Sequence, residues 1–142
     1  MQILNSLMAL GLAAVAAASG ANAADLTVEV AGIRKADGNI MIAVYDTPEK
    51  FLTPGGFLVG TRMPADAAGV IHTFTGLEPG EYAVSVFHDV DANGKLDSNF
   101  MGIPKEPVGI SRDARGSFGP PKFRDAAFKL TAEGSRQKVY LD

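Results

Sequence analysis

The 142-residue chain contains no cysteine. It therefore forms no disulfide, whatever the redox state of its compartment, and it lacks the thiol that cysteine-dependent enzymes use as a nucleophile. A bacterial lipoprotein anchor also needs a cysteine at the cleavage site, so no such anchor is expected. Stability must come from the hydrophobic core, for which 46% apolar residues are sufficient in a single domain.

An excess of positive charge is also absent, because the formal net charge is -3 at pH 7. Nucleic acid is therefore excluded as a general partner, since phosphate binding needs a concentrated basic surface. The charge is unevenly spread, with eight of the thirteen Lys and Arg residues from Lys105 onward and Asp89, Asp91 and Asp97 shortly before them. Each cluster is either solvated or paired with the other.

The N-terminal residues have the features of a processing signal. An apolar stretch precedes Ala21-Asn22-Ala23, which fits the small-x-small rule for signal peptidase and predicts cleavage before Ala24. The alternative is a retained membrane helix, but the stretch is short and rich in Ala and Gly. We expect a signal peptide over residues 1–23, no membrane span, and a soluble periplasmic or secreted domain over residues 24–142.

Alternation of apolar and polar residues predicts a fold made of strands. Leu26, Val28 and Val30, for example, alternate with more polar neighbours, as in a strand with one buried face. Strands are predicted over Leu26–Val30, Asn39–Asp46, Phe57–Arg62, Gly69–Phe74, Tyr82–His88, Ala126–Leu130 and Lys138–Leu141. About seven strands without a strong amphipathic helix predict an all-β fold, a two-layer antiparallel β-sandwich.

Turn residues suggest how these strands connect. Asp37-Gly38 predicts that the first two strands form a hairpin. Pro79-Gly80 predicts a tight corner, after which the Tyr82 hydroxyl can bond back to the chain a few residues upstream, as in a tyrosine corner. The segment 98–122 is rich in Gly and Pro, so it is predicted to be one long loop without regular elements, packed on the sandwich by its apolar side chains.

Several spaced motifs occur in a characteristic order. They are Gly80-Glu81-Tyr82-Ala83-Val84, His88-Asp89, Asn93-Gly94-Lys95-Leu96-Asp97, Gly102-Ile103-Pro104, Gly109, Ser111, Gly119-Pro120-Pro121, Phe123, Ala126 and Phe128. With these motifs the mature chain resembles, over nearly its whole length, an exported bacterial family catalogued as domain of unknown function 2141. The resemblance implies a secreted or periplasmic β-sandwich similar to prealbumin-like and carboxypeptidase-regulatory-like domains, with no established activity.

The stretch from Asp89 to Asp97 has the spacing of a calcium loop. Oxygen-bearing side chains at alternate positions converge when a glycine lets the chain bend sharply, and Ca²⁺ prefers six to eight oxygen ligands. The predicted metal ligands are the side chains of Asp89, Asp91, Asn93 and Asp97 and the carbonyl oxygen of Lys95. The sequence thus makes Ca²⁺ the one candidate cofactor.

This loop is not an EF-hand, because Phe100 stands where an EF-hand has its bidentate glutamate. A further ligand would have to come from Asn99, Glu106 or Asp46, and the affinity would fall in the weak extracellular range, roughly 0.1–1 mM. The competing interpretation is a type I′ hairpin turn at Asn93-Gly94 with the aspartates in solvent. That turn needs a second strand, and the residues that follow are poor strand formers, so both interpretations stay open.

A second group of residues suits an anionic partner. Basic and aromatic side chains occur together in and just after the long loop, and the candidate partner-binding residues are Arg112, Arg115, Phe118, Lys122 and Phe123. An anionic glycan, a lipid headgroup or an envelope protein would suit such a surface. The alternatives are solvation or pairing of these cations with the acidic loop.

Catalytic residues are few. The chain has two histidines, and Ser111 lacks the Gly-x-Ser-x-Gly context of a hydrolase nucleophile, so no catalytic residue is assigned. We therefore expect an exported non-enzymatic binding or interaction module with a calcium-stabilised acidic loop. The alternative is a periplasmic enzyme that uses His88 and Asp89, or a metal held in the acidic loop.

Overall fold

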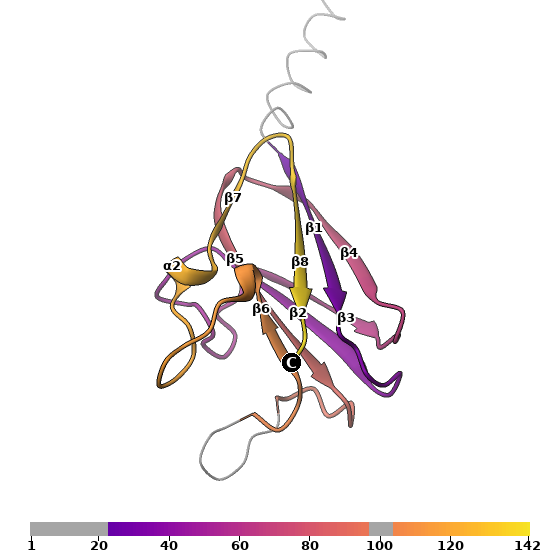
Figure 1. Ribbon diagram of the computed structural model, residues 1–142. Helices are drawn as coiled ribbons and strands as arrows, with labels where there is room; N and C mark the ends of the chain where they lie inside the picture. The colour runs from indigo at the N-terminus through magenta and orange to yellow at the C-terminus, as the bar shows by residue number, and fades with distance from the viewer. Residues whose placement is uncertain (1–22, 97–103) are drawn as a thin grey trace, which may run out of the picture.

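The computed structural model describes residues 23–96 and 104–142, and its strands form two sheets (Figure 1). The three-stranded sheet has the order β4-β1-β8, with β1 Ala24–Ala31, β4 Val70–Leu77 and β8 Ser135–Tyr140. The other has the order β3-β2-β5-β6, with β2 Asn39–Tyr45, β3 Val59–Pro64, β5 Gly80–Asp89 and β6 Val108–Ile110, and β7 Phe128–Leu130 pairs with the start of β5. Two short helical turns, η1 Ser111–Asp113 and α2 Phe123–Ala126, complete the described elements.

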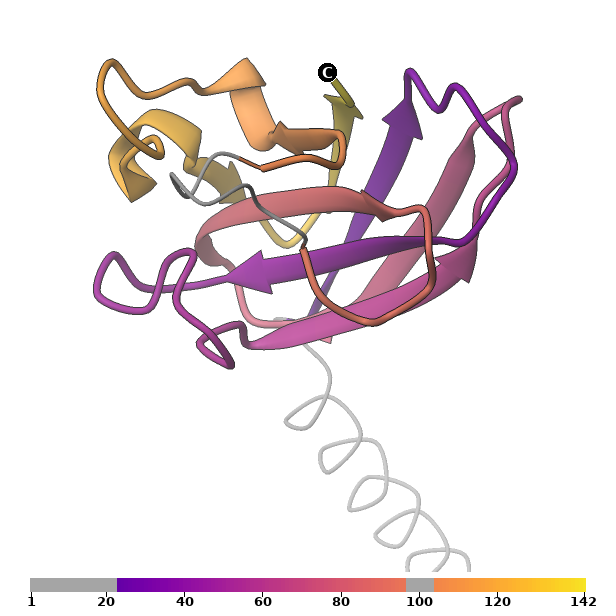
Figure 2. The ribbon, with the colours of Figure 1, turned by 90° about the horizontal axis from the view of Figure 1, so that it is seen from below.

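The two sheets stack face to face with their strands crossing (Figure 2), which confirms the predicted all-β sandwich. The alternation in β1 places Leu26, Val28 and Val30 in the core, each with 0% of its surface exposed. The alternating residues of β2 and β5 fill the core from the opposite sheet. Within residues 23–96 and 104–142, no helix has the length and apolarity to cross a bilayer. Residues 1–22 of the predicted signal peptide lie outside this described part.

The predicted hairpin between the first two strands is wrong. β1 pairs with β4 in antiparallel fashion and with β8 in parallel fashion, whereas β2 pairs with β3 and β5 in the other sheet. The Asp37-Gly38 turn therefore belongs to a connection that crosses from one layer to the other, and Ile33 in this connection is buried. The parallel pair β1–β8 is also an exception to the predicted antiparallel arrangement.

The predicted corner at the start of β5 is confirmed. The Tyr82 hydroxyl donates a hydrogen bond of 2.5 Å to the carbonyl oxygen of Glu78, four residues upstream. Burial raises the pKa of Tyr82, and the charges of Asp46 and Glu78 raise this pKa further. The corner fixes where β5 begins, and thereby its register and the position of its last residue, Asp89.

The long loop is more regular than predicted. Its described part contains β6, which pairs with Ser85–Phe87 of β5, followed by η1. Ser111 is fully buried, and its hydroxyl accepts a bond of 2.9 Å from Val84 N–H and donates one of 2.7 Å to the carbonyl oxygen of Ala126. One side chain thus ties this loop both to the centre of β5 and to the chain that enters β7.

A second hydrophobic cluster lies on the outer face of the larger sheet. The ring of Phe51 stacks edge to face with Tyr45 at 5.3 Å and with Phe123 at 5.8 Å between centroids. The loop that carries Phe51 follows β2, and it lies beside the loop that leads into α2 (Figures 1 and 2). Phe51 is buried in this cluster, whereas Phe57, in the same connection, is 47% exposed.

Candidate functional site

Asp89 is the last residue of β5 and the root of the acidic loop. It is fully buried, and its carboxylate accepts hydrogen bonds from the backbone N–H groups of Asn93 at 3.2 Å and Gly94 at 2.7 Å. Its carbonyl oxygen accepts a third bond from Ala92 N–H at 3.2 Å. The carboxylate therefore closes the loop on itself, as an acceptor aimed at consecutive backbone donors does.

The backbone of the loop excludes the predicted type I′ turn. Such a turn needs positive φ at both central residues, but the left-handed residues here are Ala92, with φ of 56°, and Gly94, with φ of 80°, not Asn93. Side-chain oxygens instead wind the loop, since Asp91 accepts from Asn93 N–H at 3.3 Å and Asn93 accepts from Lys95 N–H at 2.9 Å. Within the described part of the loop, which ends at Leu96, no strand follows Gly94.

Glu106, which follows residues 97–103 in the sequence, lies against the start of the acidic loop. Its carboxylate accepts a bond of 2.7 Å from Val90 N–H, and the next residue, Pro107, accepts one of 2.9 Å from His88 N–H. One carboxylate oxygen from each of Asp89, Asp91 and Glu106 lies within 4.8 Å of the other two. Three negatively charged groups this close repel one another unless a cation lies between them.

The structure separates the predicted ligands into three groups. Asp89 and Asp91 are together, and of the two supplementary candidates that the structure describes, Glu106 joins them. Asp46 does not, because it follows Tyr45, which pairs with Ala83, whereas Asp89 pairs with Asn39 at the opposite end of β2. Asn93 and Lys95 lie on the exposed side of the loop. Asp97 and Asn99 lie outside the described residues.

His88 faces away from this carboxylate cluster. Successive side chains of a strand point to opposite faces of the sheet. The His88 side chain therefore enters the core between the two sheets, and the Asp89 side chain lies on the other face of its sheet, under the acidic loop. His88 is 2% exposed, and its Nε2 lies 2.6 Å from the carbonyl oxygen of Asp37 in the β1–β2 connection. Gly38, the next residue, packs directly against the backbone at the end of β5, since a Cβ on Gly38 would lie 2.0 Å from the carbonyl oxygen of Asp89. His88 thus joins the β1–β2 connection to the root of the acidic loop.

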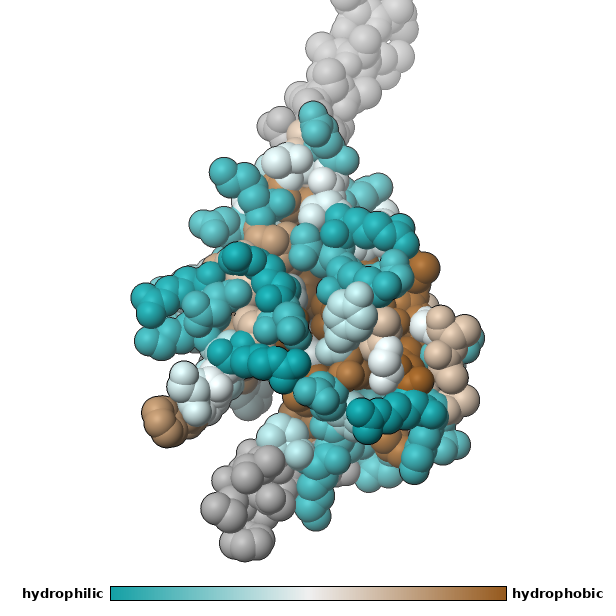
Figure 3. All heavy atoms as spheres, viewed as in Figure 1, coloured by the Kyte–Doolittle hydropathy of each residue, from teal (hydrophilic) through white to brown (hydrophobic). Residues whose placement is uncertain are grey.

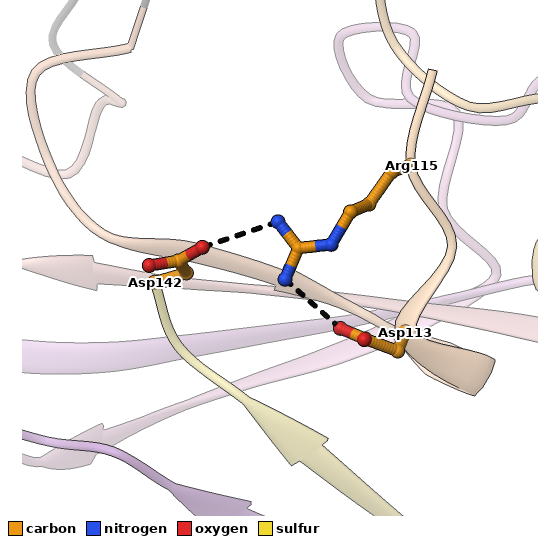
Figure 4. Close-up of polar contacts among 3 residues, drawn as sticks. All are labelled: Asp113, Arg115 and Asp142. Atoms are coloured by element: carbon orange, nitrogen blue, oxygen red, sulfur yellow. Dashed lines mark hydrogen bonds and ion pairs between the residues drawn. The ribbon is translucent and has the colours of Figure 1, made fainter. Parts of the chain in front are cut away.

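The candidate partner-binding residues occupy different environments. Arg115 lies between two carboxylates, 3.2 Å from Asp113 and 3.1 Å from Asp142 (Figure 4), and the bond to Asp142 is the main reason why its pKa is raised. Arg112 donates a bond of 3.2 Å to the carbonyl oxygen of Ala127. Phe123 is buried in the second cluster, whereas Phe118 and Lys122 are exposed. Of the five predicted residues, Phe123 is thus buried, and the other four are exposed, although Arg112 and Arg115 are bonded within the protein.

The comparisons with known proteins agree with the sequence motifs. The family described as "Uncharacterized protein conserved in bacteria (DUF2141)" matches residues 28–138, from the middle of β1 to the second half of β8. No curated protein and no solved structure matches the chain. The match covers both sheets, the acidic loop and the segment that carries Glu106 and Ser111, so the chain belongs to the bacterial DUF2141 family.

Proposed function

We propose that this protein is a non-enzymatic binding module whose acidic loop is stabilised by a calcium ion. The observation that carries the proposal is the convergence of carboxylate oxygens from Asp89, Asp91 and Glu106 within 4.8 Å. Hard, negatively charged oxygen ligands are the ones that Ca²⁺ prefers, and the ion accepts six to eight of them in flexible geometry. Water molecules would supply the remaining ligands.

Such an ion would connect two parts of the chain that are distant in sequence. Asp89 ends β5 and Asp91 follows it, whereas Glu106 leads into β6, which pairs with the same strand. The ion would offset the repulsion between the three carboxylates and hold both ends of residues 97–103 in place. The expected affinity lies in the range of extracellular calcium modules, roughly 0.1–1 mM, because few of the ligands are fixed in advance.

The geometry gives less support to the enzyme alternative. A general base must reach its substrate, but the His88 ring is buried and bonded to the carbonyl oxygen of Asp37. Asp89 is buried as well, and both of its oxygens already accept backbone N–H bonds. The Ser111 hydroxyl is similarly buried and engaged at both ends, so it is not placed to act as a nucleophile.

We further propose that the module works outside the cytoplasm, after cleavage before Ala24, and that the loop leading to α2 is its recognition surface for an anionic partner. Export suits the calcium proposal, because a site in the millimolar range fills only where Ca²⁺ is abundant. The absence of cysteine suits it too, since the fold does not depend on a redox state.

The calcium proposal is tested by thermal unfolding of residues 24–142 with and without Ca²⁺. With a dissociation constant of about 1 mM, about 10 mM Ca²⁺ stabilises the folded state by about 1.4 kcal/mol, which raises the melting temperature by several degrees. Asp91→Asn and Glu106→Gln should each remove most of this rise. Both variants also relieve charge repulsion, so without Ca²⁺ they should lose little stability.

Asp66→Asn is the matched control for these variants. Asp66 also accepts a backbone bond two residues ahead, from Ala68 N–H at 2.9 Å, but it lies in the turn before β4 and outside the carboxylate cluster. It should keep the full calcium response. The proposal fails if the unchanged protein shows no rise with Ca²⁺, or if the control loses its rise as Asp91→Asn does.

A further inference from the structure

The loop between η1 and α2 holds an aromatic ring in solvent. Phe118 is fully exposed, with a relative exposure of 105%. It lies in a tight turn, because a Cβ on Gly116 would come within 1.7 Å of the carbonyl oxygen of Gly119. Pro120 and Pro121 follow at once and restrict the chain further. The ring therefore stands on a conformationally restricted segment and lies in solvent.

Unpaired cations lie beside this ring. Across residues 23–96 and 104–142, neither Lys122 nor Arg124 has a carboxylate within ion-pair distance, although both are exposed. Hydrophilic side chains gather around α2 (Figure 3). Asp125 is the acidic residue among those that line the same surface, and Arg115 is paired with Asp113 and Asp142. Among the lining residues outside these ion pairs, the two cations Lys122 and Arg124 therefore outnumber the single carboxylate.

A hollow of about 400 Å³ lies within this loop. Lys122 and Arg124 line it together with Ser117 and the glycine-rich turn, which offer hydroxyl and backbone N–H donors. The hollow is open to solvent and mostly polar, so it suits a small charged group better than an apolar ligand. A phosphodiester suits this hollow, because it is negatively charged and its oxygen atoms accept hydrogen bonds from such donors.

We propose that the loop from Arg115 to Asp125 docks on membrane surfaces that contain anionic phospholipid. The phosphodiester of one headgroup lies between Lys122 and Arg124, and the Phe118 ring enters the interface beside it. Aromatic rings favour the interface between the headgroups and the hydrocarbon core of a bilayer. Each basic residue near an anionic membrane surface increases the affinity of the protein for that surface. This inference rests on the binding-module function proposed above and names its partner.

The experiment is vesicle binding by the chain 24–142, whose two core clusters run from Ala24 to Leu141 and so include no residue of the predicted signal. Vesicles of phosphatidylcholine mixed with phosphatidylglycerol should sediment the protein at low salt in the presence of EDTA, and vesicles of phosphatidylcholine alone should not. Joint substitution Lys122→Gln and Arg124→Gln should weaken binding about 30-fold, whereas Asp125→Asn should strengthen it about fivefold. The matched control, Arg34→Gln with Lys35→Gln on the β1–β2 connection, should leave it unchanged.

Insertion of the ring has its own readout, because the chain contains no tryptophan. In Phe118→Trp the single indole should shift its emission to shorter wavelength on phosphatidylglycerol vesicles, while Ile71→Trp, an exposed position on β4, should not. The inference is overturned if the mixed vesicles do not bind, if the control pair weakens binding equally, or if free glycerol phosphate binds and vesicles do not. Because EDTA removes Ca²⁺, the vesicle assay does not depend on the calcium site. A protein that is stabilised by Ca²⁺ but does not bind vesicles would refute the lipid partner and leave the proposed calcium-stabilised module intact.

Discussion

Replacing Ser111 with alanine tests how the long loop is held on the sandwich. β6 covers β5 at Ser85–Phe87 and β7 covers it at Gly80–Tyr82, so neither strand reaches Val84. The Ser111 hydroxyl fills this gap, accepting from Val84 N–H and donating to the Ala126 carbonyl oxygen. Ser111→Ala leaves both backbone groups without these partners in a site that water does not reach.

The magnitude follows from these two groups. A buried donor or acceptor left unsatisfied costs about 1–3 kcal/mol, and the lost oxygen atom leaves only a small gap, so Ser111→Ala should lower the free energy of unfolding by about 2–6 kcal/mol. Urea unfolding followed by circular dichroism measures this quantity. Ser117→Ala makes the same chemical change at an exposed position and should stay within about 0.5 kcal/mol of the unchanged protein. Equal stability of the two variants would refute the reasoning.

Three further changes probe other contacts by the same urea assay. Tyr82→Phe removes the corner hydrogen bond and should cost about 1 kcal/mol, more than Tyr140→Phe at an exposed position, and equal losses would contradict this. Gly109→Ala should cost about 1–3 kcal/mol, because its Cβ would lie 2.4 Å from the Tyr140 carbonyl oxygen, and an unchanged midpoint would show that β6 can shift. The hydrogen bond from Arg136 lowers the pKa of Glu29 below 4.5, so this ion pair stabilises the fold above that pH and is lost as the pH falls through the lowered pKa. Glu29→Gln should therefore reduce the loss of unfolding free energy that acidification causes below pH 4.5. The same dependence of the unfolding free energy on pH in both proteins would contradict a contribution from this ion pair.

Local patterns in the sequence predict most of the strands but not their partners. Alternation of apolar residues identified β1, β2, β4 and β5, since a period of two depends only on neighbours along the chain. The tyrosine corner was also predictable, because its two partners are four residues apart. The Asp37-Gly38 turn misled the prediction, since the same residues suit a hairpin and a connection between layers. Partner choice depends on the burial of whole faces, which no local turn encodes.

The candidate site was predictable in part for a similar reason. The spacing of Asp89, Asp91 and Asn93 predicted oxygen atoms that converge on a calcium ion. In the structure these side-chain oxygens accept backbone N–H bonds within the loop, which the spacing did not predict. Glu106 was one of three candidates, and only the pairing of β6 with β5 brings it to Asp89. The bonds of Ser111 left no local signal, because both of its partners come from other segments.

The position of β8 has a consequence for how the chain folds. β8 lies beside β1, with Leu26 opposite Ser135 and Ala31 opposite Tyr140, so the first and last strands of the domain are neighbours. Closing so long a stretch of chain before these contacts form is entropically costly, and folds rich in such contacts form slowly. Until Ser135–Tyr140 has been synthesised, one edge of β1 remains bare and open to pairing with other chains. The chain therefore completes its smaller sheet only as its last strand is added, and loss of that strand would turn a folded domain into one prone to aggregation.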